Sequence, residues 1–236
     1  AFNKRDIIYN PATLASKPNE SNFKKREIRY FSKEEMALIT EECSRLYNTG
    51  TRVYPYGDAF ILALHTGLRM GELIALQKSD VDFEAKTLTV RRNAQVVGNR
   101  NADGSRASGR KTVLSTTKTY SGTRTISLNS IALEAARRLC DSHPDAQRVV
   151  CSIRGGQVTH ERFERSFYRV LRNCGIEKTG VHSLRHTFAS ILFEQGVDIK
   201  TISTLLGHAS TKITLDTYIH LIRDTGKYAV ETLEAI

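Results

Sequence analysis

Most of the chain carries hydrophobic residues at the three- and four-residue spacing of amphipathic helices. This spacing predicts helices at about residues 33–50, 56–66, 70–78, 129–141, 159–174, 183–196, 198–206 and 210–222. Ser32 and Glu35 form a capping-box pattern at the start of the first helix. Alternating β-branched and polar residues predict strands near 86–97, 112–118, 123–128 and, as a short strand, 149–152. The pattern therefore indicates a mainly α fold with a small antiparallel β-sheet, an α+β class.

Turn-forming residues divide the chain into three parts. Asn10 and Pro11 end a short N-terminal piece, and the basic, proline-containing stretch up to about residue 30 predicts an exposed linker. A 40% hydrophobic composition suffices for the core of one large domain or two small ones. We expect one domain at residues 31–225. Residues 226–236 begin at a glycine and carry an apolar helical stripe, which predicts a terminal helix. This helix would either dock on a neighbouring protomer or fold back on its own chain.

Residues 98–110, GNRNADGSRASGR, separate two of the predicted strands. They are rich in Gly, Ser and Arg and contain nothing large that could pack in a core. We therefore expect an inserted mobile loop at this point.

The segment from His182 to Tyr218 carries the strongest chemical signal. His182 and Arg185 are three residues apart and share the first turn of a predicted helix, while His208 follows a glycine and Tyr218 comes ten residues later. An arginine matches two phosphate oxygens, an imidazole can move a proton and a phenol can attack phosphorus. An isolated pair such as His182 and Arg185 more commonly caps a core helix. The signal is specific because His208 and Tyr218 follow, and the four residues together indicate a phosphoryl-transfer site.

This segment resembles the C-terminal active-site block of the tyrosine recombinase, or phage integrase, family. Residues 1–9 resemble the last helix of the DNA-clamping domain that precedes the catalytic domain in this family, and the resemblance implies the catalytic domain at residues 31–225. The stretch AFILALHTGLRMGELIAL (59–76) is similar to the element that supplies the first active-site arginine of that family, here Arg69. Gly67 and Gly71 permit a tight turn, so Arg69 is expected at a helix junction, with Glu72 orienting it. The alternative is a surface arginine between two helices.

A lysine completes the set that the resemblance implies. The stretch KTVLSTTKTYSGTRTISL (111–128) predicts a hairpin that turns at residues 120–122, and it resembles the family element that carries the catalytic lysine. Lys118 lies two residues before this turn and is the favoured candidate. Lys111 is the competing one, and either lysine could instead be solvated or bind a phosphate.

The charge of the chain favours a nucleic-acid partner. The net charge is +10, and residues 91–124 contain eight basic residues and a single acidic one. The basic residues are Arg91, Arg92, Arg100, Arg106, Arg110, Lys111, Lys118 and Arg124, and the acidic residue is Asp103. Such clustering is typical of a face that binds duplex DNA. Charge alone would also suit a solvated loop, an RNA or an anionic membrane surface.

Composition narrows the class further. No apolar run approaches the roughly 20 residues of a membrane span, so no membrane partner is expected. Four scattered cysteines without CxxC spacing indicate reduced thiols in a cytoplasmic protein. His182 and His186 are four apart and could clamp a metal, but no third ligand accompanies them, so no metal and no cofactor are expected.

The resemblance implies an enzyme that breaks and rejoins double-stranded DNA through a 3′-phosphotyrosine. Tyr218 would be the nucleophile and His182 the base, while Lys118 would protonate the leaving 5′-oxygen. Arg69 and Arg185 would neutralise the phosphate, with His208 bonded to one of its oxygens. A dimer to tetramer on DNA and accessory DNA-bending or excision proteins would be the partners, and the long insertion is similar to conjugative-transposon integrases. A type IB topoisomerase-like enzyme and a non-catalytic DNA-binding regulator are the alternatives.

Overall fold

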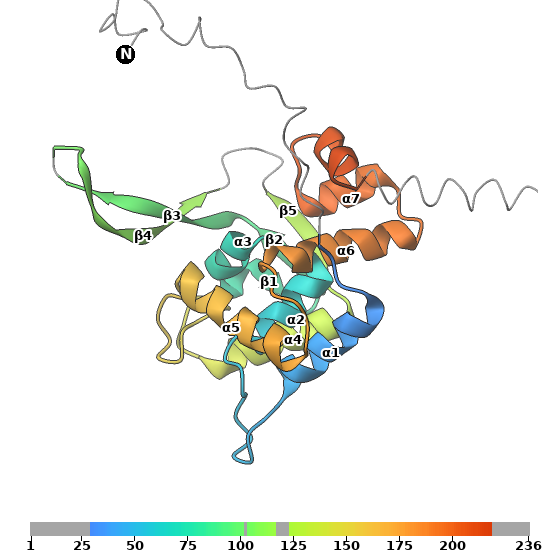
Figure 1. Cartoon of the computed structure of the whole chain (residues 1–236), viewed down its shortest axis with the longest axis horizontal. Helices are drawn as coiled ribbons and strands as arrows, with labels where there is room; N and C mark the ends of the chain where they lie inside the picture. The colour runs from blue at the N-terminus through green and yellow to red at the C-terminus, as the bar shows by residue number, and fades with distance from the viewer. Residues whose placement is uncertain (1–28, 102, 117–122, 219–236) are drawn as a thin grey trace, which may run out of the picture.

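The computed structural model describes residues 29–101, 103–116 and 123–218 (Figure 1). Its helices are α1 (Lys33–Ser44), α2 (Gly57–Thr66), α3 (Met70–Ala75), the 3-10 turn η4 (Lys78–Asp80), α4 (Ser130–Ser142), α5 (His160–Asn173), α6 (His182–Glu194) and α7 (Ile199–Leu206). Residues 211–218 are also helical. The strands are β1 (Val81–Asp82), β2 (Thr87–Val90), β3 (Arg92–Arg100), β4 (Arg106–Thr116) and β5 (Arg124–Ser127). The predicted α+β class is confirmed. The expected linker and terminal helix, at residues 1–28 and 226–236, lie outside the described residues.

Helix α2 forms the centre of the main core. Every residue of this helix except His65 is buried, as expected for a helix that is apolar on all sides. Helices α1, α4 and α6 contact it, and the ring of Phe60 packs against Phe163 and Phe167 of α5 at centroid distances of 4.8 and 5.1 Å. This packing holds α2, whose C-terminal end leads into the turn before Arg69.

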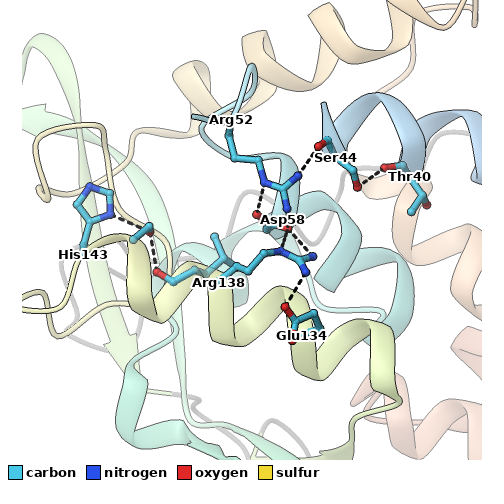
Figure 2. A network of polar contacts seen from close by, with 9 residues as sticks. Thr40, Ser44, Arg52, Asp58, Glu134, Arg138 and His143 are labelled. Atoms are coloured by element: carbon cyan, nitrogen blue, oxygen red, sulfur yellow. Dashed lines mark hydrogen bonds and ion pairs between the residues drawn. The ribbon is translucent and has the colours of Figure 1, made fainter. Parts of the chain in front are cut away.

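One buried carboxylate joins α2 to its surroundings (Figure 2). Asp58 is 6% exposed and accepts hydrogen bonds from Arg52 Nε at 2.9 Å and Arg138 Nε at 2.8 Å. Arg138 belongs to α4 and also pairs with the exposed Glu134, while Arg52 donates to the backbone oxygen of Ser44 at the end of α1. The network therefore links α2 to α4 and to the end of α1. Loss of either arginine would leave the buried charge of Asp58 less compensated and would destabilise the fold.

The strands form two separate antiparallel sheets. Strand β2 lies between β1 and β5 in one sheet, and β3 and β4 pair as a long hairpin in the other. The hairpin projects from the helical body (Figure 1). The predicted 86–97 strand is thus two strands, divided at Arg91.

The hairpin overturns the prediction of a mobile loop at residues 98–110. Strand β3 runs to Arg100 and β4 starts at Arg106, so backbone pairing continues through most of this stretch despite a register shift between Gly98 and Arg100. Asn101 and Ser105 close the turn through a backbone bond of 2.9 Å. Strand pairing satisfies backbone groups without any core to pack in, which is why the polar composition misled the prediction.

The predicted hairpin across residues 120–122 is also wrong. Strand β4, on its N-terminal side, pairs with β3, and β5, on its C-terminal side, pairs with β2. Leu88 and Ile126, opposite each other in β2 and β5, are both buried. The burial of this apolar pair, which local alternation of residues does not specify, decides the partner of β5.

Three smaller expectations also change. The capping box of Ser32 and Glu35 is present, but α1 ends at Ser44 rather than near Gly50, because residues 46–52 form a tight turn closed by a bond from the Tyr47 amide to the Thr51 carbonyl. The third predicted helix stops at Ala75, and Lys78–Asp80 is a separate 3-10 turn. The expected strand near 149–152 is reduced to an isolated bridge between Gln77 and Arg148.

Two glycines allow the turn between α2 and α3. Gly67 caps α2 with φ of +64°, a conformation that favours glycine. Gly71 lies inside α3 without positive φ, but a Cβ there would come within 2.2 Å of the Asn93 side chain and 2.5 Å of the Ala94 carbonyl oxygen. The second glycine therefore serves the close approach of β3 to α3.

The four cysteines are free thiols, as predicted. Among the described residues, no helix combines the length and apolar character needed to cross a bilayer.

Candidate active site

Arg69 lies at the junction that the sequence predicts, as the N-cap residue of α3. Its Nη1 donates to Glu72 Oε1 at 2.8 Å, and its backbone N–H donates to Glu72 Oε2 at 2.9 Å. About a third of the side chain remains exposed, at 35%. Glu72 thus orients this guanidinium, as expected, while part of it stays open to a ligand.

Arg185 is the most deeply placed cation of the site. It is 2% exposed, and its Nη1 and Nη2 donate to the backbone oxygens of Gly67 at 2.8 Å and Leu206 at 2.6 Å. Burial, and secondarily the nearby Arg69, lowers its pKa to about 9. The group stays cationic at neutral pH, and a guanidinium has five N–H donors, so further donors remain for a phosphate.

A third arginine, Arg124 at the start of β5, completes this arrangement. Its Nη1 and Nη2 donate to the two oxygens of Glu72 at 3.0 and 2.8 Å, and its Nε donates to the Leu205 carbonyl at 2.6 Å. Both side chains are almost fully buried. The four donated bonds and two cations hold the pKa of Glu72 at about 2, although burial alone would raise it.

The three arginines meet three consecutive backbone oxygens at the end of α7. Arg124 binds Leu205, Arg185 binds Leu206, and Arg69 binds Gly207 at 3.3 Å. A helix C-terminus carries unpaired carbonyls and partial negative charge, which favour cations. The end of α7 therefore aligns the guanidiniums and also fixes the position of His208, the next residue in the chain.

The sequence interpretation missed this role of Arg124. It counted Arg124 in the basic face for DNA, but the side chain is buried and bound within the protein. Arg91 and Arg92, from the same cluster, both pair with the buried Asp80. The part of that cluster that could bind a nucleic acid is therefore smaller than the composition indicates. The sequence around Arg124 does not indicate its buried partner Glu72, which lies 52 residues earlier in the chain.

The two predicted imidazoles border the guanidiniums. His182 is the first residue of α6 and is exposed, yet surrounding protein atoms, then Arg185 and Arg69, lower its pKa. His208 Nδ1 shares a hydrogen bond of 2.7 Å with the hydroxyl of the buried Thr214. Burial and the three arginines lower the pKa of His208 to about 4. Both rings are therefore neutral at pH 7, and Thr214 fixes how His208 is turned.

Tyr218 ends the described chain in a small apolar cluster apart from the main core. It is 2% exposed and packs with Ala189, Ile202 and Leu206. Its hydroxyl lies 2.9 Å from His186 Nδ1, and burial raises its pKa to about 12 although Arg185 opposes the change. The phenol is thus protonated in the free protein.

The lysine of the set cannot be placed. Lys118 lies outside the described residues, so its assignment stays a prediction, and the competing Lys111 is exposed on β4. Arg124, six residues after Lys118, is anchored in the site. In the described ranges, no group of three His, Cys, Asp or Glu side chains could hold a metal ion.

The comparisons with known proteins agree with this arrangement. The Phage integrase family matches residues 29–224, so the chain belongs to this family, whose members are the tyrosine recombinases. It is 32% identical over 225 residues to a XerC-like tyrosine recombinase of Caldanaerobacter subterraneus subsp. tengcongensis, covering 88% of this chain and 54% of that protein. It is also 27% identical over 189 residues to the ICEBs1 integrase of Bacillus subtilis, with 74% and 47% covered.

Solved structures show the same fold. The Tn1549 transposon integrase in complex with a circular intermediate DNA superposes with a TM-score of 0.69 at 21% identity, covering 90% of this chain and 68% of that one. The XerA recombinase superposes with a TM-score of 0.63 at 25% identity, covering 87% and 66%. The chain spans about half the length of the curated relatives it matches.

Proposed function

We propose that the chain is the catalytic part of a site-specific DNA recombinase that cuts and rejoins duplex DNA through a 3′-phosphotyrosine. One observation carries the proposal. Arg69 and Arg185, 116 residues apart in sequence, are fixed on neighbouring carbonyls of α7, next to two neutral imidazoles and a tyrosine. Such a site can hold a phosphodiester and offer it a nucleophile without a metal ion.

Each residue has a distinct task in this reaction. Tyr218 attacks the scissile phosphorus, and the 5′-oxygen leaves with a proton from Lys118. The guanidiniums of Arg69 and Arg185 offset the charge that builds on the two non-bridging oxygens, and His208 bonds to one of them. The phosphodiester energy is kept in the tyrosine link, so a 5′-hydroxyl can reverse the step and join the strands without ATP.

The full protein would act as a dimer to tetramer on DNA in the cytoplasm, in the movement of a mobile element. The Tn1549 integrase, a relative in fold, has been solved with a circular intermediate DNA, which supports duplex DNA as the partner here. Residues 226–236 are proposed to dock on a neighbouring protomer, because their apolar stripe needs a surface. Accessory DNA-bending or excision proteins would control the direction of the reaction.

Two other functions would use part of the same site. A topoisomerase-like enzyme would relax supercoils without exchanging strands between two sites, and a DNA-binding regulator would form no covalent adduct. The family of the chain and its integrase relatives favour recombination over both. Strand exchange between two labelled sites separates the first alternative, and adduct formation separates the second.

The test begins with selection of a DNA site. A pool of duplexes with a randomised central segment, each nicked within it, is incubated with the chain, and adducts that survive denaturation are sequenced. Tyr218→Phe should retain DNA binding but yield no adduct, while Tyr47→Phe, a change at an exposed tyrosine, should match the wild type. An adduct formed equally well by Tyr218→Phe would refute the proposal.

A further inference from the structure

His186 has no part in the reaction as described so far, yet it touches the nucleophile. It follows Arg185 directly in α6 and lies one helical turn after His182, on the same face. The His182 and His186 rings are 5.0 Å apart at an interplanar angle of 81°. The His186 and Tyr218 rings are 5.9 Å apart at 62°. His186 therefore stands between the exposed histidine of the site and the buried tyrosine.

The contact with Tyr218 is a hydrogen bond that can carry a proton. His186 Nδ1 and the Tyr218 hydroxyl are 2.9 Å apart, within the range expected of a general base and its substrate proton. This is the hydrogen bond that the Tyr218 hydroxyl makes among the described residues. His182, which the family resemblance suggests as the base, makes no hydrogen bond to that hydroxyl.

We propose that His186 is the proton acceptor for Tyr218, a role that rests on the proposed recombinase function. As the Tyr218 oxygen forms its bond to phosphorus, the hydroxyl proton passes to His186 Nδ1 and leaves an imidazolium. The 5′-oxygen departs with its electron pair and takes a proton from Lys118. His186 returns its proton to Tyr218 when the strands are rejoined, so no other reactant is consumed.

Burial and the neighbouring positive charges make His186 a weak base in the free protein. Burial, then the neighbouring His182 and Arg185, lowers the pKa of His186 to about 4, while that of Tyr218 is about 12. The proton therefore stays on the phenol in the free protein. A phosphodiester anion on Arg185 would offset the positive charge that disfavours an imidazolium, and so make His186 a stronger base in the complex.

The assignment also divides the work between the two histidines of α6. His186 is partly buried beside the phenol, whereas His182 is exposed to solvent. His182 is then free to donate a hydrogen bond to a phosphate oxygen. Two histidines one turn apart thus act on the two reacting groups, His186 on the Tyr218 hydroxyl and His182 on the phosphate.

The test uses the full chain and the nicked duplex selected above. His186→Asn keeps a hydrogen-bonding group near the position of Nδ1 but cannot take up a proton. We expect DNA affinity to stay the same and single-turnover cleavage at pH 7 to slow about 10²- to 10³-fold, the usual contribution of a general base. His143→Asn, which changes a histidine at the end of α4, is the matched control and should cleave like the wild type.

Two further readouts distinguish a base from a residue that only supports the fold. Without His186 the proton must go to hydroxide, so the rate of His186→Asn should rise about tenfold per pH unit from pH 7 to 9 and approach the wild-type rate. A 5′-bridging phosphorothiolate needs no proton on its leaving group. It should therefore leave the defect of His186→Asn unchanged.

The outcomes separate this inference from the proposed function. If the wild type forms no Tyr218-dependent adduct, the recombinase function itself fails. If the wild type cleaves but His186→Asn cleaves equally well or faster, His186 is not the base. A slow variant whose pH profile parallels that of the wild type would also overturn the proposal, because a structural role would give that result.

Discussion

Replacement of Glu72 by glutamine tests whether one buried carboxylate holds the arginines in place. Glu72 is 4% exposed and accepts bonds from the Arg69 backbone, the Arg69 side chain and both ends of the Arg124 guanidinium. Glu72→Gln keeps the shape of the side chain but turns an N–H donor toward one of these donors. Two guanidiniums then lose their counter-charge.

The size of the effect follows from the pKa. A drop from 4.5 to about 2 corresponds to about 3 kcal/mol, because one pKa unit equals about 1.4 kcal/mol. Since the pKa of the folded state lies below that of the unfolded chain, this stability is complete above about pH 5 and disappears as the pH falls from 4.5 toward 2. Glu72→Gln should therefore lower the free energy of unfolding by about 3 kcal/mol at pH 7, and by progressively less below pH 4.5.

Urea unfolding of wild type and variant at several pH values between 7 and 3 measures this difference. Glu134→Gln is the matched control, because Glu134 pairs with Arg138 but is 56% exposed, and exposed pairs contribute about 0–1 kcal/mol. An unfolding free energy for Glu72→Gln within about 0.5 kcal/mol of wild type at pH 7, or a difference that does not change with pH, would refute the reasoning.

Three further predictions concern DNA. Lys118→Ala should lose cleavage but recover it on a 5′-bridging phosphorothiolate duplex, whereas Arg69→Ala should not; equal recovery in single-turnover assays would contradict the division between acid and clamp. A two-residue Asn-Gly turn in place of 98–110 removes three arginines, so the slope of log affinity against log salt should become shallower by about 0.9 per lost phosphate contact; an unchanged slope means that the hairpin does not touch DNA. Deletion of 226–236 should weaken cooperative assembly on paired sites more than half-site binding, and equal cooperativity in gel-shift titrations would exclude trans docking.

The sequence predicted where Arg69, His182 and Arg185 lie in the fold better than which residues hold them in place. Arg69, His182 and Arg185 could be placed because their helices begin or end at local signals such as Gly67. The partner of each strand could not be predicted. Strand β4 pairs with β3 and β5 pairs with β2, and these choices depend on apolar residues far away in the sequence. Arg124 was assigned to the basic face for DNA, because its buried partner Glu72 lies 52 residues away in the sequence.

His186 escaped prediction for a related reason. Four residues after His182, it was considered as half of a metal clamp, because spacing in a helix shows which residues share a face. It does not show what lies opposite that face. Only the return of the chain through α7 to Tyr218 brings a hydroxyl to its ring.

The end of α7 also determines where this protein tolerates changes in length. Each residue added to a helix turns everything beyond it by about 100°, so one insertion within α7 would point the Leu205, Leu206 and Gly207 oxygens away from their arginines. An insertion before Asp198, whose side chain caps the start of α7, would leave that helix and its far end intact. Natural variants and engineered fusions should therefore differ in length between α6 and α7, and keep an unchanged count of residues from Asp198 to His208.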